Sequence, residues 1–163
     1  NAVLPTISLP ALTTQTNDNQ TNNAALTTIS LPNLTTQTNG NQTGNALLTS
    51  VSLPNLATQG DNNQKSNAAL VTLTLPSLLT QTNNNQKLNA ALITFTANAL
   101  TTQTDSNQTD NPLITTITTP ALTSIGTSNY VGCTYNILTI NVDASLFGAA
   151  DILLAQAGGA TII

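Results

Sequence analysis

The chain lacks histidine, glutamate, tryptophan and methionine, and Cys133 is its only cysteine. Without histidine and glutamate, neither a Ser-His-Asp triad nor a Cys-His pair can be assembled. No group of residues has the spacing of a zinc site or a calcium loop. Asp61 and Asp105 lie two repeats apart, which is about 10 Å at the usual strand spacing and wide for a catalytic pair. We therefore expect no catalytic residue, no cofactor and no metal, and we expect Cys133 to occupy a buried repeat position.

Charge is also scarce. Lys and Arg together number 2, Asp numbers 6, and the formal net charge is −4. Binding to nucleic acid or to an anionic membrane surface needs basic residues, so both are disfavoured. No apolar run reaches transmembrane length, and we expect no membrane insertion. A single cysteine excludes an internal disulfide.

Leu, Ile, Val and Ala supply most of the hydrophobic 39%, and aromatic residues make up only 2%. Thr, Asn, Gln and Ser dominate the remainder. The hydrophobic content is too high for a simply disordered chain. Small apolar residues combined with uncharged polar ones suit an elongated, repetitive β structure.

The chain repeats with a period of 22 residues. A sixth, degenerate copy starts at Ile117, and the six N-terminal residues NAVLPT resemble the tail of another copy, so we expect the chain to begin in mid-coil. Five gapless copies start at Ile7, Ile29, Val51, Leu73 and Phe95, and they read ISLPALTTQTNDNQTNNAALTT, ISLPNLTTQTNGNQTGNALLTS, VSLPNLATQGDNNQKSNAALVT, LTLPSLLTQTNNNQKLNAALIT and FTANALTTQTDSNQTDNPLITT.

Each copy predicts one coil of a solenoid. The alternation at Ile29 and Leu31 indicates a strand, and Pro32 ends it because proline has no N–H to donate. A second extended piece follows over residues 35–38, and the Asn-, Gly- and Thr-rich stretch 37–45 favours turns. One coil cannot bury its own Leu and Ile, whereas stacked coils bury them in a continuous core. We expect a mainly β repeat solenoid with parallel strands.

Amides recur at fixed repeat positions, and stacked amides can bond each other from coil to coil. Three rows of this kind predict structural Asn/Gln ladders. They are Asn19, Asn41, Asn63, Asn85 and Asn107; Gln20, Gln42, Gln64, Gln86 and Gln108; and Asn23, Asn45, Asn67, Asn89 and Asn111.

The pattern L-x-x-I-x-L-P-x-L resembles the BspA-like bacterial form of the leucine-rich repeat. The last copy, ITTPALTSIGTSNYVGC from Ile117 to Cys133, is the most similar. The resemblance implies a right-handed coil, and it implies a surface or secreted protein used for adhesion and partner binding. The five earlier copies place a glutamine where the family has isoleucine, which makes the interior more polar. These glutamines are Gln15, Gln37, Gln59, Gln81 and Gln103.

The C-terminal segment does not follow the 22-residue repeat pattern. We divide the chain into tandem repeats over residues 1–140 and a C-terminal cap over residues 141–163. Apolar residues at helical spacing predict a helix from Ser145 to Ala157, with Gly158 and Gly159 as its stop. Thr161–Ile163 is expected to form one last strand. An atypical terminal unit of this kind shields the end of a repeat core.

Two Ser/Thr positions flank the inward apolar residue of each predicted strand. Stacked coils would align them in a two-file array of hydroxyl groups, which is similar to the ice-binding face of β-solenoid antifreeze proteins. A second T-x-T row recurs around Gln15, Gln37, Gln81 and Gln103. Threonine also simply suits an exposed sheet. The candidate binding face is Thr6, Ser8, Thr28, Ser30, Ser50, Ser52, Thr72, Thr74, Thr94, Thr96, Thr116 and Thr118.

Three hypotheses for function follow. The first is a non-enzymatic, secreted or cell-surface module for adhesion, surface or glycan binding, or structural scaffolding. The second is ice binding through the T-x-T rows, and the third is a fibre-forming subunit. A polysaccharide, another surface or self-association are the expected partners, because precise protein interfaces usually need Trp, Tyr or Arg.

Overall fold

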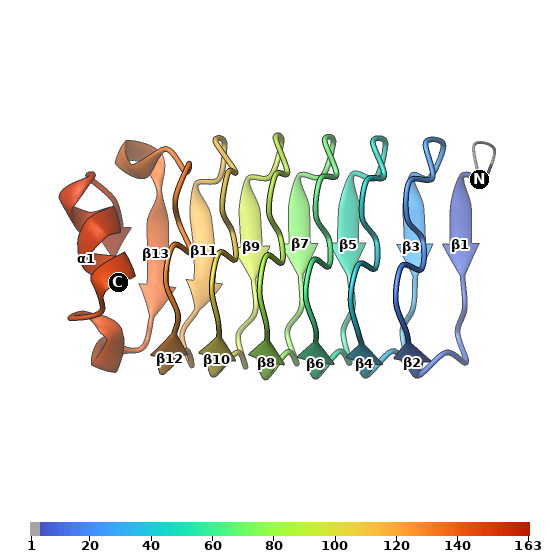
Figure 1. The fold of residues 1–163 in the computed structure, drawn as a ribbon, viewed down its shortest axis with the longest axis horizontal. Coiled ribbons are helices and arrows are strands. Elements are labelled where there is room, and N and C mark those ends of the chain that lie inside the picture. Colours follow the sequence, from blue (N-terminus) through green and yellow to red (C-terminus); the bar gives the residue numbers. More distant parts are fainter. Residues whose placement is uncertain (1–3) are drawn as a thin grey trace.

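The computed structural model describes residues 4–163, and the predicted start in mid-coil falls partly on residues 1–3, outside the described part. The chain forms a parallel β-solenoid whose coils stack along one long axis, as the sequence predicts (Figure 1). The long strands are β1 Thr6–Ser8, β3 Thr28–Ser30, β5 Ser50–Ser52, β7 Thr72–Thr74, β9 Thr94–Thr96, β11 Thr116–Thr119 and β13 Thr139–Val142. The short strands are β2 Thr14–Gln15, β4 Thr36–Gln37, β6 Thr58–Gln59, β8 Thr80–Gln81, β10 Thr102–Gln103 and β12 Ser124–Ile125.

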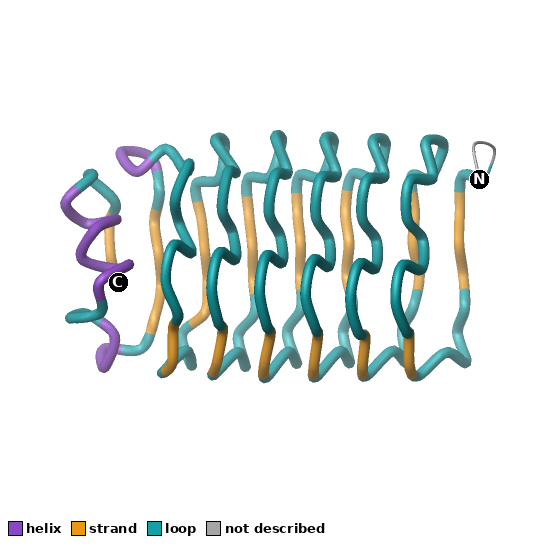
Figure 2. The backbone as a smooth tube through the Cα atoms, in the orientation of Figure 1, coloured by secondary structure: helices purple, strands orange, loops and turns teal. Residues whose placement is uncertain are grey.

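Strand pairing follows the 22-residue period. Thr72 pairs with Thr94 and Leu73 with Phe95, and the short strands keep the same offset. The short strands form one six-stranded sheet. The row of long strands is divided into a two-stranded sheet, β1-β3, and a six-stranded sheet that runs from β5 to the final strand β14, Thr161–Ile162. Figure 2 shows the turn segments passing on the near side of the solenoid, with the long strands behind them.

Aliphatic side chains fill the interior at the repeat positions that the periodicity predicts. In one coil Leu70, Leu73, Leu75 and Leu78 are all fully buried. Equivalent residues of the neighbouring coils join them in one continuous cluster. The core is therefore a column of stacked Leu and Ile, in which each layer covers the layer before it.

Two ladders of buried glutamines run through the interior beside this column. In the strand Gln ladder (Gln15, Gln37, Gln59, Gln81, Gln103), Gln59 Nε2 donates to Gln81 Oε1 at 2.7 Å, and Gln37 and Gln81 likewise donate toward the C-terminal end, whereas Gln15 Nε2 donates to Gln20 Oε1. In the turn Gln ladder (Gln20, Gln42, Gln64, Gln86, Gln108), Gln64 Nε2 donates to Gln42 Oε1 at 2.8 Å, in the opposite direction. The side chains of the strand Gln ladder thus point inward, and hydrogen bonds between coils satisfy most of their polar atoms, although Gln37 Oε1 and Gln103 Nε2 have no partner among the described residues.

Two asparagine rows connect side chains to backbone. Asn63 N–H donates to Asn85 Oδ1 at 2.8 Å, and Asn67 N–H donates to Asn89 Oδ1 at 2.8 Å. Asn67 Nδ2 also donates to the carbonyl of Gln42, one coil back, at 2.8 Å. The predicted amide ladders are confirmed, and they hold turns that have no regular strand pairing.

The C-terminal cap keeps the repeat register although its backbone changes. Asp151 lies 22 residues after Asn129, and its carboxylate accepts the N–H groups of Ser128 and Asn129, so it takes the place of the next ladder asparagine. The α-helix α1 spans Ala150–Ala157 and not the predicted Ser145–Ala157. The segment before it forms the 3-10 helix η2, Ala144–Leu146, because the Asp143 carboxylate accepts from Ser145 N–H and starts a separate tight turn. A further 3-10 turn, η1, spans Tyr135–Ile137.

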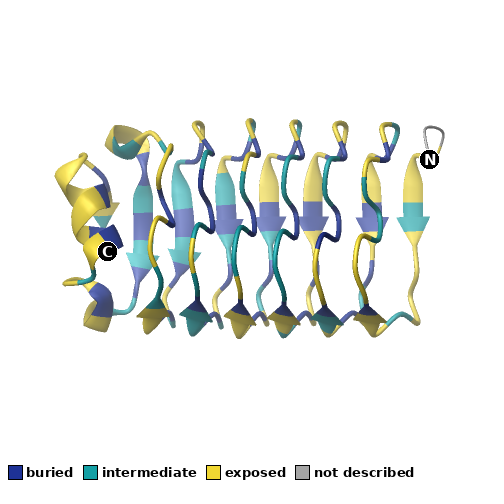
Figure 3. Ribbon diagram, viewed as in Figure 1, coloured by how far each residue is buried: buried dark blue, intermediate teal, exposed yellow. Residues whose placement is uncertain are grey.

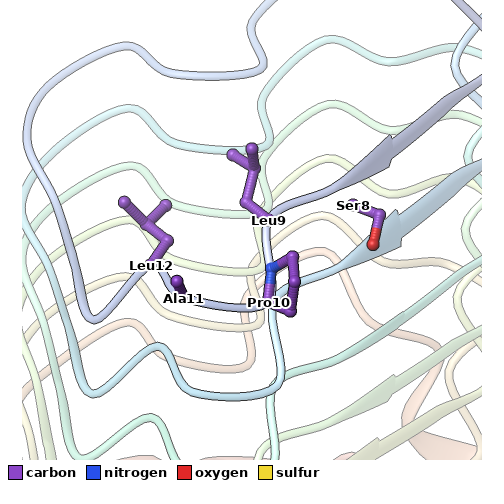
Figure 4. Close-up of a pocket in the computed structure, with 5 residues that line it drawn as sticks. All are labelled: Ser8, Leu9, Pro10, Ala11 and Leu12. Carbon is purple, nitrogen blue, oxygen red and sulfur yellow. The ribbon is translucent and has the colours of Figure 1, made fainter.

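The N-terminal end leaves its core layer open. Leu9 is 41% exposed, whereas its repeat equivalents Leu31 and Leu53 are 1% and 0% exposed. A largely apolar pocket at this end is lined by Ser8, Leu9, Pro10, Ala11 and Leu12 (Figure 4). The pocket is the exposed side of the aliphatic column.

Candidate functional site

The structure places every residue of the predicted candidate face on the outside of the long strands. Strands β3, β5, β7, β9 and β11 bury a central apolar residue and turn the two flanking Ser/Thr side chains outward, as in Thr72-Leu73-Thr74, whereas the central Ile7 of β1 is only half-buried. Figure 3 shows this as a buried band across β3, β5, β7 and β9, whose ends are more exposed. We call this surface the hydroxyl face, and it comprises Thr6, Ser8, Thr28, Ser30, Ser50, Ser52, Thr72, Thr74, Thr94, Thr96, Thr116 and Thr118. Strand pairing aligns them in two files within each sheet, from Thr6 to Ser30 in β1-β3 and from Ser50 to Thr118 in β5 to β11.

The short-strand sheet carries the second Thr row, and some of its hydroxyl groups are used inside the protein. Thr38 Oγ1 donates to Asn17 Oδ1 at 2.6 Å, and Thr104 Oγ1 donates to Asn83 Oδ1 at 2.6 Å. Thr58 Oγ1 bonds Thr36 Oγ1 at 3.4 Å. No such bond involves a side chain of the hydroxyl face within residues 4–163. The two Thr rows, which look equivalent in sequence, therefore differ in the hydroxyl groups they can offer a ligand.

A third exposed file lies beside the hydroxyl face, and sequence reasoning missed it. It consists of the residue just before strands β3, β5, β7, β9 and β11, which is β-branched in all five: Thr27, Thr49, Val71, Ile93 and Thr115. Ile93 N–H and Thr94 N–H both donate to the carbonyl of Val71, at 2.9 and 3.2 Å. Two successive residues opposite one partner form a bulge-like bend, which lets both side chains face outward. The sequence does contain a signal for this file, which is the β-branched residue repeated just before the strand. Strand alternation alone would place that side chain in the interior.

Charged side chains are kept away from the hydroxyl face. The two lysines, Lys65 and Lys87, lie in the turn segments, and so do Asp18, Asp61, Asp105 and Asp110; the other two acids belong to the cap. Lys87 Nζ approaches Asp110 Oδ2 at 3.8 Å. Because the turn segments lie on the side opposite the long strands (Figure 2), the hydroxyl face is uncharged along its length.

The candidate reactive groups have structural partners. Asp61 Oδ1 accepts the N–H of Asn83 at 2.7 Å, and Asp105 Oδ1 accepts the N–H of Thr127 at 2.7 Å. Cys133 occupies the repeat position of the buried Asn111 but is only half-buried, not fully buried as expected, and its thiol donates to the carbonyl of Gln108 at 3.1 Å. Burial raises the pKa of Cys133 to about 11, so its thiol stays protonated and weakly nucleophilic at neutral pH.

Two of the four N-x-T sequons are locked in the amide ladders. Asn41 and Asn107 are fully buried, and their side-chain amides donate to the carbonyls of Thr38 and Thr104. The remaining sequons begin at Asn19 and Asn33, and of these Asn33 is exposed.

Within residues 4–163, no cluster of three or more His, Cys, Asp or Glu could hold a metal ion. The same part of the chain contains no helix long and apolar enough to cross a membrane. Comparison with known proteins adds no relative, since no protein-family model, curated protein or solved structure matches this chain.

Proposed function

We propose that the chain is a non-enzymatic binding module of the cell exterior, whose hydroxyl face adheres to a periodic, uncharged ligand such as a polysaccharide or another ordered surface. One observation carries the proposal. The hydroxyl groups of this face are aligned by strand pairing and have no partner inside the described chain, whereas some of those on the short-strand sheet, such as the hydroxyl groups of Thr38 and Thr104, bond within it. A stack of equal donors and acceptors suits a ligand that repeats as the coils do, about every 4.8 Å.

The resemblance to BspA-like leucine-rich repeats supports an adhesive role outside the cell. The residues of the face favour a repetitive ligand over a single protein partner, because Trp, Tyr and Arg, which dominate protein hot spots, are absent from it. A non-enzymatic role accords with carboxylates and a thiol that are held by backbone groups.

Ice is the second candidate ligand. It is favoured by one feature, the regular presentation of threonine hydroxyl and methyl groups without any charged or aromatic side chain between them. A fibre-forming or scaffolding role is the third, and the amide ladders that bond successive coils along the axis support it.

The experiment compares two double variants in the same two coils. Thr72→Tyr/Thr94→Tyr places bulky rings on the hydroxyl face, and Thr80→Tyr/Thr102→Tyr does the same on the short-strand sheet as the matched control. Each protein is tested for retention on insoluble cellulose and chitin, and for thermal hysteresis and ice-crystal shaping.

We expect binding to be lost only in Thr72→Tyr/Thr94→Tyr. Retention on a polysaccharide supports adhesion as the function, whereas ice shaping without retention moves ice binding to first place. Equal loss in both variants, or loss only in the control, would refute the hydroxyl face as the binding surface. If the parent chain neither binds nor shapes ice, analytical ultracentrifugation tests the fibre alternative.

A further inference from the structure

We propose that the ligand is a neutral polysaccharide lying along the solenoid axis, and that it also contacts the third file, Thr27, Thr49, Val71, Ile93 and Thr115, which we call the methyl file. This inference rests on the proposed function, because it names the ligand of the same hydroxyl face. It adds a specificity-determining surface to that face.

The methyl file presents apolar groups throughout. Val71 is 37% exposed and Ile93 is 41% exposed, although both are aliphatic. The hydroxyl groups of Thr27 and Thr115 donate to carbonyls of the preceding coil, at 3.1 and 3.4 Å. The group that these two threonines offer to a ligand is therefore their methyl group.

The bulge-like bend places this file directly beside the hydroxyl face. The coils of β3, β5, β7, β9 and β11 then repeat a triad of one methyl-bearing residue and two free hydroxyl groups, such as Val71 with Thr72 and Thr74. The triad recurs in strand-pairing register, so it forms parallel apolar and polar stripes along the axis.

A neutral sugar polymer has the chemistry that fits both stripes. Its C–H surface can cover the methyl file, and its hydroxyl groups can exchange hydrogen bonds with the two hydroxyl files. Apolar contact stabilises a complex only when the ligand also removes apolar area from water, which an ice lattice has no C–H groups to supply. The absence of charge along this side of the molecule excludes strong attraction to an ionic polymer.

The first test removes methyl groups without adding bulk. Val71→Thr/Ile93→Thr should weaken binding to xylan or mannan about tenfold, since each buried CH2 group contributes about fourfold to an equilibrium constant. Leu79→Thr is the control, because Leu79 is an exposed aliphatic residue in the corresponding position of the short-strand sheet. The control should bind as the parent chain does, and all three proteins should unfold at similar temperatures.

The second test extends the methyl file. Thr49→Val exchanges one hydroxyl group for a methyl group and should strengthen binding up to fourfold. Unchanged affinity in Val71→Thr/Ile93→Thr and in Thr49→Val, with loss in Thr72→Tyr/Thr94→Tyr, would overturn the role of the methyl file and leave the proposed function standing. Preference for anionic alginate over xylan and mannan, or ice shaping without binding to either neutral polymer, would overturn the ligand class.

Discussion

At the scale of single residues, the turn segments depend on left-handed backbone conformations. Three positions in each of the first five turns have positive φ, and they carry Gly, Asn, Asp, Ser or ladder glutamines, with one exception. Leu88 has φ 61°, where its repeat equivalents Gly44 and Gly132 have φ 70° and 77°. For a residue with a branched side chain this conformation costs roughly 1–2 kcal/mol, which asparagine largely avoids.

Leu88→Asn should therefore raise the free energy of unfolding by about 1 kcal/mol. Leu88 is 45% exposed, so little apolar burial is lost. Leu113→Asn is the control, because Leu113 is also exposed but is not among the residues with positive φ. Chemical denaturation measures the free energy of unfolding of both variants. If Leu88→Asn lowers this free energy as much as Leu113→Asn does, the backbone at Leu88 is not strained.

Cys133 gives the protein a pH dependence at alkaline pH. Its pKa is raised in the folded state from 9.0 to about 11, mainly by burial, so between these values the folded state binds more protons than the unfolded state. Stability from this group is thus complete below pH 9 and is lost as the pH rises toward 11.

We expect the unfolding temperature to fall between pH 9 and 11. Cys133→Asn should reduce this fall, because asparagine occupies the equivalent position 111 and donates to the same kind of carbonyl. Calorimetry from pH 7 to 11 measures both proteins, and identical curves would show that the thiol is not responsible. Tyr130, whose pKa burial also raises, accounts for a fall that remains in the variant.

At the scale of structural elements, the amide ladders decide how well the coils stack. Gln81 accepts from Gln59 Nε2 and donates to Gln103 Oε1, so a change at this position leaves two buried amide atoms without partners. Gln81→Leu should destabilise the protein by about 2–4 kcal/mol, since each buried unsatisfied polar group costs about 1–3 kcal/mol. Thr80→Val, on the exposed side of the same strand, should change stability by less than about 0.5 kcal/mol. Urea denaturation measures the free energy of unfolding of both variants. Similar losses of stability in the two would contradict the claim that the glutamine ladder stabilises the stacked coils.

The strands and ladder rows could be predicted from sequence because the repeat fixes their offset. The alternation at Ile29 and Leu31 then shows which side chains point inward. The direction of Gln37 could not be read in this way, because a glutamine is buried only where a neighbour accepts its donors, and that partner comes from the next coil. The role of Asp151 was hidden for a similar reason, since a change to helix conceals the conserved spacing of 22 residues from Asn129.

The candidate face was also predictable only in part. The T-x-T pattern identified its residues, but it identified the short-strand sheet equally well. What separates the two sheets is the bonding of Thr38 and Thr104 to asparagines one coil back, which depends on the turn conformation. The methyl file depends on a bulge-like bend at Val71 and Ile93, and strand alternation does not reveal such a bend.

At the scale of the whole molecule, the solenoid places each kind of side chain in a different part of its cross-section. Aliphatic residues form the central column, amides bind the coils together, charges lie along the turns and free hydroxyl groups lie along the long strands. Because each coil contacts mainly its neighbours, this arrangement extends along the axis without change. A ligand that repeats along one direction can therefore meet the same groups in successive coils.

The most direct measurement is protection of single thiols by the bound ligand. In a Cys133→Asn background, Thr72→Cys and Thr80→Cys place one exposed thiol on each sheet of the same coil. Maleimide labelling rates are compared for the free protein and for the protein bound to the polysaccharide or ice that retains the parent chain. We predict that the ligand slows labelling at position 72 and leaves position 80 unchanged. Equal protection at both positions, or protection at position 80 alone, would contradict binding through the hydroxyl face.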